Sequence, residues 1–170
     1  DMAPYTQHLG KDRFAERIGN AYLIGLNSNF MKNVEQNSLE EQSQFAWLKK
    51  TLKKKHKKDH VIVFLHHPFF LENYGEEEGY STLSESIRNK YFSLFDEYGV
   101  EFVIAGHLHD NREANHNGIE MVTTSAAGRQ LGTAQPGIRI IQLRKGNISQ
   151  QYFTLDQLPD TRENIIASFI

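Results

Sequence analysis

The sequence contains no cysteine. Disulfide bonds, thiolate metal ligands and cysteine nucleophiles are therefore excluded, so that any metal ion must be held by histidine, carboxylate or asparagine side chains. The absence of cysteine is compatible with a reducing and with an oxidising compartment, and it leaves the localisation open.

The chain also lacks long apolar runs and a large excess of charge. No stretch of about eighteen apolar residues could cross a bilayer, and no basic start followed by an apolar stretch indicates a signal peptide. Lysine and arginine number 19 against 21 aspartate and glutamate, a net charge of −2, which gives no broad basic surface for nucleic acid. We interpret the lysine-rich segment 49–58 as a solvated helix face rather than a phosphate or nucleic-acid patch. Neither a membrane nor a nucleic acid is expected as a partner.

Two common catalytic motifs are missing as well. Gly128 and Gly132 flank Arg129 outside any strand-to-helix context, and no glycine-rich phosphate loop with a lysine is present. Ser125 does not lie in a Gly-x-Ser-x-Gly pattern. A nucleotide-binding loop and a serine hydrolase are therefore not expected.

The apolar patterns predict an α/β fold, and 170 residues suffice for a single domain, 1–170, with one core. Capping boxes at Ser38 and Thr82, each followed by glutamate three residues later, predict two helix starts. The expected elements are strands 13–16 and 21–26, a helix 39–57, a strand 60–65, a helix ending near residue 99 and a strand 100–105. Alternating helices and strands indicate parallel pairing with right-handed crossovers.

The pattern changes to hairpins after residue 105. Strands are expected at 112–116 and 119–124 around the turn Asn117-Gly118, and at 138–143 and 148–154 around a second glycine-containing turn. A short helix capped by Asp156 is expected to follow.

Histidines follow both buried strands. His107 and His109 stand two residues apart after the strand 100–105, and in extended backbone they would point to the same side. His66 follows the strand 60–65, and parallel pairing would place it beside His107 because ligand sites in open α/β sheets lie at the carboxyl ends of the strands. Imidazole is the commonest metal ligand in proteins, so we expect His66, His107 and His109 to bind metal.

Asp110 and Asn111 are expected to orient these imidazoles by hydrogen bonding. The alternative is that His107 and His109 only cap a strand and bond to the loop 113–117. The other histidines that stand in polar surroundings are interpreted as surface residues: His8, His56, His60 and His116.

Two blocks resemble a known family, the calcineurin-like metallophosphoesterases, which include purple acid phosphatases and protein serine/threonine phosphatases. Phe64-Leu65-His66-His67-Pro68 resembles the His-x-Pro block of this family, and Gly106-His107-Leu108-His109 resembles its Gly-His-x-His block, in the same order and spacing. Weaker similarity in segments 10–14, 26–29 and 124–128 extends the match over nearly the whole chain. The small cytosolic phosphatases are the most similar subgroup, which favours the cytoplasm.

The resemblance implies a four-layer α/β/β/α sandwich in which His66 and His107 bind one metal ion and His109 binds another. It also implies hydrolysis of a phosphomonoester or phosphodiester with two divalent ions drawn from Mn, Fe, Zn or Mg, whose identity the ligands do not decide. Tyr80 and Arg88 follow the His-x-Pro block and are expected to contact the substrate, with structural roles as the alternative.

The family's earlier blocks, which carry the carboxylate bridge, the asparagine and the histidine acid, are not in this sequence. We therefore expect the chain to be the C-terminal part of such a domain, to hold at most one metal ion weakly and to be inactive alone. Unpaired strand edges would then favour self-association. The other hypothesis is a non-catalytic module that binds a metal or a partner.

Overall fold

The computed structural model describes residues 3–144 and 146–169, which form two sheets and five helices. The elements run in the order α1 (Ala3–Leu9), β1 (Phe14–Ile18), β2 (Ala21–Gly25), α2 (Ser28–Lys32), α3 (Ser38–Leu52), β3 (His60–Phe64), α4 (Glu85–Tyr98), β4 (Val100–Ala105), β5 (Arg112–His116), β6 (Ile119–Thr123), β7 (Gly137–Arg144), β8 (Asn147–Thr154) and α5 (Arg162–Ala167). None of the described helices is long and apolar enough to span a bilayer.

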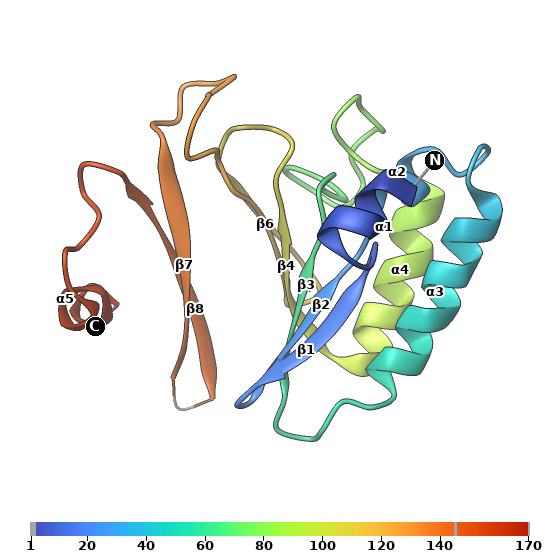
Figure 1. Cartoon of the computed structure of the whole chain (residues 1–170), viewed down its shortest axis with the longest axis horizontal. Coiled ribbons are helices and arrows are strands. Elements are labelled where there is room, and N and C mark those ends of the chain that lie inside the picture. The colour runs from blue at the N-terminus through green and yellow to red at the C-terminus, as the bar shows by residue number, and fades with distance from the viewer. Residues whose placement is uncertain (1–2, 145, 170) are drawn as a thin grey trace.

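The larger sheet has the strand order β1-β2-β3-β4-β6-β5 (Figure 1). The pairs β2–β3, β3–β4 and β4–β6 are parallel, whereas β1 and β5 close the two edges in antiparallel pairs. The predicted parallel pairing is confirmed, and β3 and β4 lie side by side with their carboxyl ends at the same edge. Their runs of buried β-branched and aromatic residues fit strands that are covered on both faces.

Helices α3 and α4 cover one face of this sheet (Figure 1). The predicted apolar stripe of α4 is buried at Ile87, Tyr91, Leu94 and Phe95. Each such side chain contributes about 1.5–3 kcal/mol by leaving water. Between the two helices, the Nζ atom of Lys90 lies 2.6 Å from a carboxylate oxygen of the buried Glu41.

The β7–β8 hairpin covers the other face. Ile62, Phe102, Ile104 and Val122 of the large sheet form a buried cluster, against which side chains of the hairpin pack, namely Ile141, Leu143 and Ile148. Helix α5 lies on the outer side of the hairpin (Figure 1). The layers therefore follow the expected α/β/β/α order.

The predicted helix starts were wrong by one to several residues. Ser38 lies inside α3, whose N-cap is Asn37. Helix α4 begins after Ser84, while the Thr82 hydroxyl instead accepts a hydrogen bond from the backbone of Gly79. The last helix begins after Thr161 rather than Asp156, because the Thr161 hydroxyl accepts a hydrogen bond from the backbone N–H of Asn164. Helices α1 and α2 were not predicted.

Gly137 tests the packing of the hairpin. A methyl group built on Gly137 would lie 2.1 Å from the carbonyl oxygen of Phe153, which is backbone and cannot move aside easily, whereas one built on Gly128 meets nothing within 4 Å. We expect Gly137→Ala to lower the free energy of unfolding by about 1–3 kcal/mol and Gly128→Ala to change it by less than about 1 kcal/mol. Urea unfolding measures both, and equal effects would contradict the tight hairpin.

Candidate metal centre

The site lies where β3 and β4 end. The backbone N–H of Leu65 donates to the carbonyl oxygen of Ile104 at 3.0 Å, and that of Gly106 donates to the carbonyl oxygen of His66 at 3.1 Å. The parallel ladder thus continues for one step beyond each strand. It fixes His66 beside the Gly106-His107 peptide, although 41 residues separate the two histidines in the sequence.

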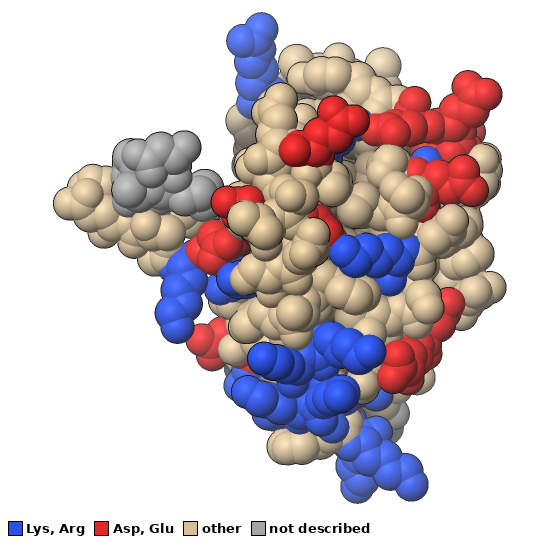
Figure 2. Space-filling view, turned by 90° about the vertical axis from the view of Figure 1, so that its right-hand side faces the viewer, with Lys and Arg blue, Asp and Glu red and all other residues tan. Residues whose placement is uncertain are grey.

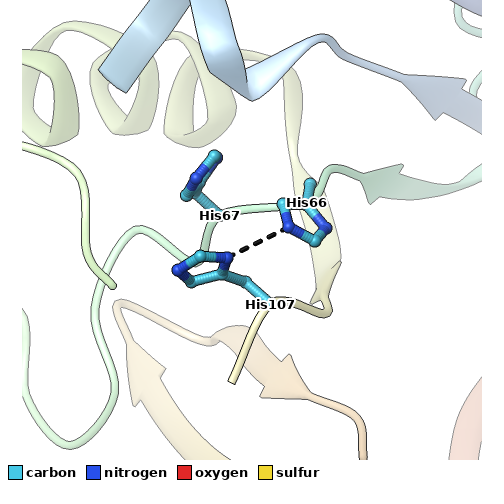
Figure 3. Close-up of side chains that lie close together, drawn as sticks. All are labelled: His66, His67 and His107. Atoms are coloured by element: carbon cyan, nitrogen blue, oxygen red, sulfur yellow. Dashed lines mark hydrogen bonds between the residues drawn. The ribbon is translucent and has the colours of Figure 1, made fainter. Parts of the chain in front are cut away.

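Three imidazoles meet at this point (Figure 3). The Nε2 atom of His66 lies 3.0 Å from Nδ1 of His107, and the rings of His67 and His107 are 4.4 Å apart between centroids. One nitrogen from each of the three histidines lies within 4.8 Å of the others, and no other such group of three metal-binding side chains occurs among the described residues. The structure therefore brings together two of the three predicted ligands, His66 and His107, and adds His67.

His67 is held by Ser28. The Ser28 hydroxyl lies 2.9 Å from Nδ1 of His67 and accepts the backbone N–H of the same residue at 2.9 Å. Nδ1 is therefore engaged, and Nε2 is the nitrogen left for a metal ion or a substrate. Burial lowers the pKa of His67 from 6.5 to about 4, helped by His107, His66 and Lys32.

His107 is also favoured in its neutral form. Burial lowers its pKa, and the neighbouring His66, His109 and Lys32 act in the same direction. Metal binding requires the neutral imidazole. The surroundings of His67 and His107 therefore keep both rings in the form that can accept a cation.

His109 lies outside this group of three. Its Nδ1 is 2.7 Å from the carbonyl oxygen of Arg129. Because a carbonyl oxygen only accepts, Nδ1 carries the proton and Nε2 keeps a free lone pair, which is the arrangement of metal-binding histidines oriented by a backbone carbonyl. The predicted ligand His109 is therefore not brought together with His66 and His107 in the group of three.

The backbone of the Gly-His-x-His segment is not extended, contrary to the expectation. His107 has a φ of 66° and His109 a φ of 52°, both in the left-handed region. Residues other than glycine rarely adopt this conformation, and such outliers gather at functional sites. His107 and His109 therefore stand in a tight turn rather than in an extended strand.

The described hydrogen bonds and salt bridges of Asp110 and Asn111 go to groups other than the imidazoles. Asp110 forms a salt bridge of 2.8 Å with Arg112. The side-chain oxygen of Asn111 accepts the backbone N–H of Ser125 at 3.0 Å, and the Ser125 hydroxyl donates to the carbonyl oxygen of His109 at 3.0 Å. Asn111 thus supports the backbone of His109 through Ser125, and the predicted direct orientation of the rings is not observed.

The two predicted substrate contacts differ. Tyr80 is 87% exposed, and its ring centroid lies 5.5 Å from that of His107, so it stands beside the cluster and is accessible. Arg88 is fully buried and donates to the carbonyl oxygens of Leu83 and Tyr74. The expected substrate contact of Arg88 is wrong, because its guanidinium is buried and binds backbone carbonyls of the loop between β3 and α4.

Ser28 and His67 were missed by sequence reasoning, but a signal was present. Residue 28 follows β2, the parallel neighbour of β3, so it reaches the same edge of the sheet. His67 stands next to the predicted ligand His66.

A calcineurin-like phosphoesterase family model matches residues 3–111 of the chain. The chain belongs to this family. The bovine serine/threonine-protein phosphatase CPPED1 is 32% identical over 161 residues, which cover 94% of this chain and 51% of the relative. Its human counterpart is 34% identical over 154 residues, which cover 89% and 49%. The chain spans about half the length of these curated relatives.

Solved structures support the calcineurin-like fold. GAP50, the anchor in the inner membrane complex of Plasmodium, matches with a TM-score of 0.65 and 16% identity over 84% of this chain and 49% of that chain. A dimetal phosphatase from Danio rerio matches with a TM-score of 0.50 and 14% identity over 74% and 51%. At these identities the likeness concerns the fold alone.

The pKa of His67 leads to a prediction for the metal-free chain. The pKa of His67 is about 4 in the folded chain and 6.5 in the unfolded chain, so the unfolded chain binds a proton first as the pH falls. The contribution of the neutral ring to the free energy of unfolding is therefore fully present above pH 6.5 and is lost as the pH falls towards 4. We expect His67→Gln to reduce the loss of stability over this interval, as measured by urea unfolding at several pH values. An NMR titration midpoint of the His67 ring near 6.5 would contradict the prediction.

Proposed function

We propose that this chain is the C-terminal, histidine-bearing part of a metal-dependent phosphoesterase domain in which His66, His107 and His109 ligate divalent ions. The observation that carries the proposal is the meeting of His66 and His107 at 3.0 Å at the carboxyl edge of the sheet. Membership of the calcineurin-like phosphoesterase family supports phosphate-ester hydrolysis as the reaction.

The donor set suits one ion well. Neutral imidazole nitrogens bind Zn, Mn and Fe more readily than Mg, which prefers oxygen ligands. The 3.0 Å separation of the His66 and His107 nitrogens is near the spacing of two ligands on one ion, and their mutual hydrogen bond would be replaced by metal coordination. His109 offers its free Nε2 to a second ion. Since the described residues provide no carboxylate for a bridge, we propose that preceding segments of a longer chain supply it.

The residues of this chain would position the substrate and the ligands. Bound divalent ions would supply a nucleophile at neutral pH and charge stabilisation for the phosphoryl group. His67, held by Ser28, offers Nε2 beside the cluster as a hydrogen-bonding group for a phosphate oxygen. The exposed ring of Tyr80 beside His107 is our proposed contact for the alcohol portion of a phosphate ester. Phosphoserine or phosphothreonine is our proposed substrate class, because the curated relatives are named serine/threonine phosphatases.

Metal binding tests the ligand set. We expect isothermal titration with Mn²⁺ or Zn²⁺ to detect one weak site in this chain, and His66→Ala or His107→Ala to weaken it at least about tenfold. His56→Ala is the matched control, since His56 is exposed and follows α3 at the other end of the sheet. Equal affinity in all variants, or no binding by the unmodified chain, would contradict the proposed centre.

Hydrolysis separates the enzyme from the non-catalytic module. We expect negligible turnover of p-nitrophenyl phosphate by this chain with Mn²⁺, and measurable turnover when the chain is extended at its N-terminus to the length of the CPPED1 relatives. His107→Ala in the extended protein should lower the turnover at least about a hundredfold, because one ligand of the centre is lost. If the extended protein binds metal with the same affinity as this chain and hydrolyses no phosphate ester, the result would favour the non-catalytic module.

A further inference from the structure

A basic surface lies at the end of the sheet remote from His66, His67 and His107. It consists of the lysine segment, which we define as Lys49, Lys50, Lys53, Lys54, Lys55, Lys57 and Lys58. All of these side chains are exposed except that of Lys55, which is half-buried. They gather around the C-terminal end of α3 in the lower part of Figure 2.

The lysines of this segment have no acidic partners. Within residues 3–144 and 146–169, none of them forms a salt bridge, whereas Lys32 and Lys90 are paired with Glu78 and Glu41 at 3.2 and 2.6 Å. A hollow lined by three lysines of the segment also contains Asp59 and Glu101. Asp59 contacts Arg17, and Glu101 contacts His60.

Asp59 lies 2.7 Å from the guanidinium of Arg17 and also accepts the backbone N–H of His56. Glu101 lies 2.9 Å from Nδ1 of His60. Asp59 is thus paired with a guanidinium, whereas Glu101 contacts an imidazole and lines the same hollow as Lys55, Lys57 and Lys58. The seven lysines of the segment still outnumber these two carboxylates.

Stabilisation of α3 explains only part of the segment. Cations favour a helix C-terminus, but the effect is confined to about the last turn. Lys49 and Lys50 lie in that turn, whereas Lys54, Lys57 and Lys58 follow the helix. A solvated helix face, as expected from the sequence, therefore does not account for the later lysines.

An exposed apolar residue borders the segment. Ile18 is 68% exposed at the end of β1. Its neighbour Arg17 donates to the carbonyl oxygen of Lys54 at 3.0 Å, and the backbone N–H of His60 donates to the carbonyl oxygen of Asn20 at 2.8 Å. The β1–β2 turn and the lysine segment thus form one continuous surface at the lower end of Figure 1.

We propose that this surface binds the anionic phospholipids of a membrane peripherally, with the lysines near the headgroups and Ile18 at the interface. Clustered lysines without a fixed fork geometry suit a diffuse negative surface. Nucleic acid is less well matched, since residues 49–60 contain no arginine and no Phe, Tyr or Trp ring, and Arg17 is paired with Asp59. Acidic side chains gather at the opposite end of the same face in Figure 2, so the molecule would approach such a membrane with its basic end first.

Sedimentation with vesicles tests the proposal. We expect the chain to bind vesicles of phosphatidylcholine with 30% phosphatidylserine and to be released at high salt, but not to bind phosphatidylcholine alone. Each lysine near the surface contributes about fivefold to the partition coefficient, so Lys57→Gln with Lys58→Gln should lower it at least about tenfold. The matched control is Lys11→Gln with Arg162→Gln, which removes the same charge from exposed positions elsewhere.

Further variants and competitors distinguish the remaining explanations. Ile18→Ser should lower the partition coefficient without removing the salt dependence, and circular dichroism melting checks that each variant folds. Equal losses in the two double variants, or equal binding to neutral vesicles, would overturn the proposal. So would binding to a short single-stranded RNA without binding to vesicles, or full displacement by millimolar inorganic phosphate, which would indicate a site for free anions.

Discussion

The pairing of β3 with β4 is the constraint on which the candidate metal centre depends. Two hydrogen bonds beyond the regular strands hold the His66 backbone against that of Gly106. This places the side chains of His66 and His107 next to each other. Both strands are buried on two faces, by the helices on one side and the β7–β8 hairpin on the other. The cores of both layers therefore stabilise the geometry of a few solvent-facing imidazoles.

The turn after β4 adds a second constraint, which separates His109 from the cluster. Left-handed conformations at His107 and His109 cost free energy, and contacts around the turn compensate for it. The carbonyl oxygen of Arg129 fixes the ring of His109, while Ser125, held by Asn111, fixes its backbone. His107 belongs to the cluster of three imidazoles, whereas His109 lies outside it. Under the proposed function, the two histidines would therefore bind different ions.

The sequence predicted the elements that are defined by periodic burial and failed where tertiary contacts decide. Strands at β3 and β4 and the apolar stripe of α4 follow directly from runs of apolar residues, and the meeting of His66 with His107 follows from their parallel order. Arg88 was misread because an arginine that follows the His-x-Pro block suits a phosphate, whereas its guanidinium binds two backbone carbonyls of a loop. The role of Ser28 depends on a third strand end, which local patterns do not reveal.

The parallel strands β2, β3, β4 and β6 give the large sheet two chemically different ends. The imidazoles lie at the carboxyl ends of these strands, and the contact of His60 with Glu101 lies beside the lysine segment at their starts. If the basic end contacts a membrane, the imidazoles face away from it. Under the function proposed above, a ligand of the imidazole cluster would then arrive from the aqueous phase rather than from the bilayer.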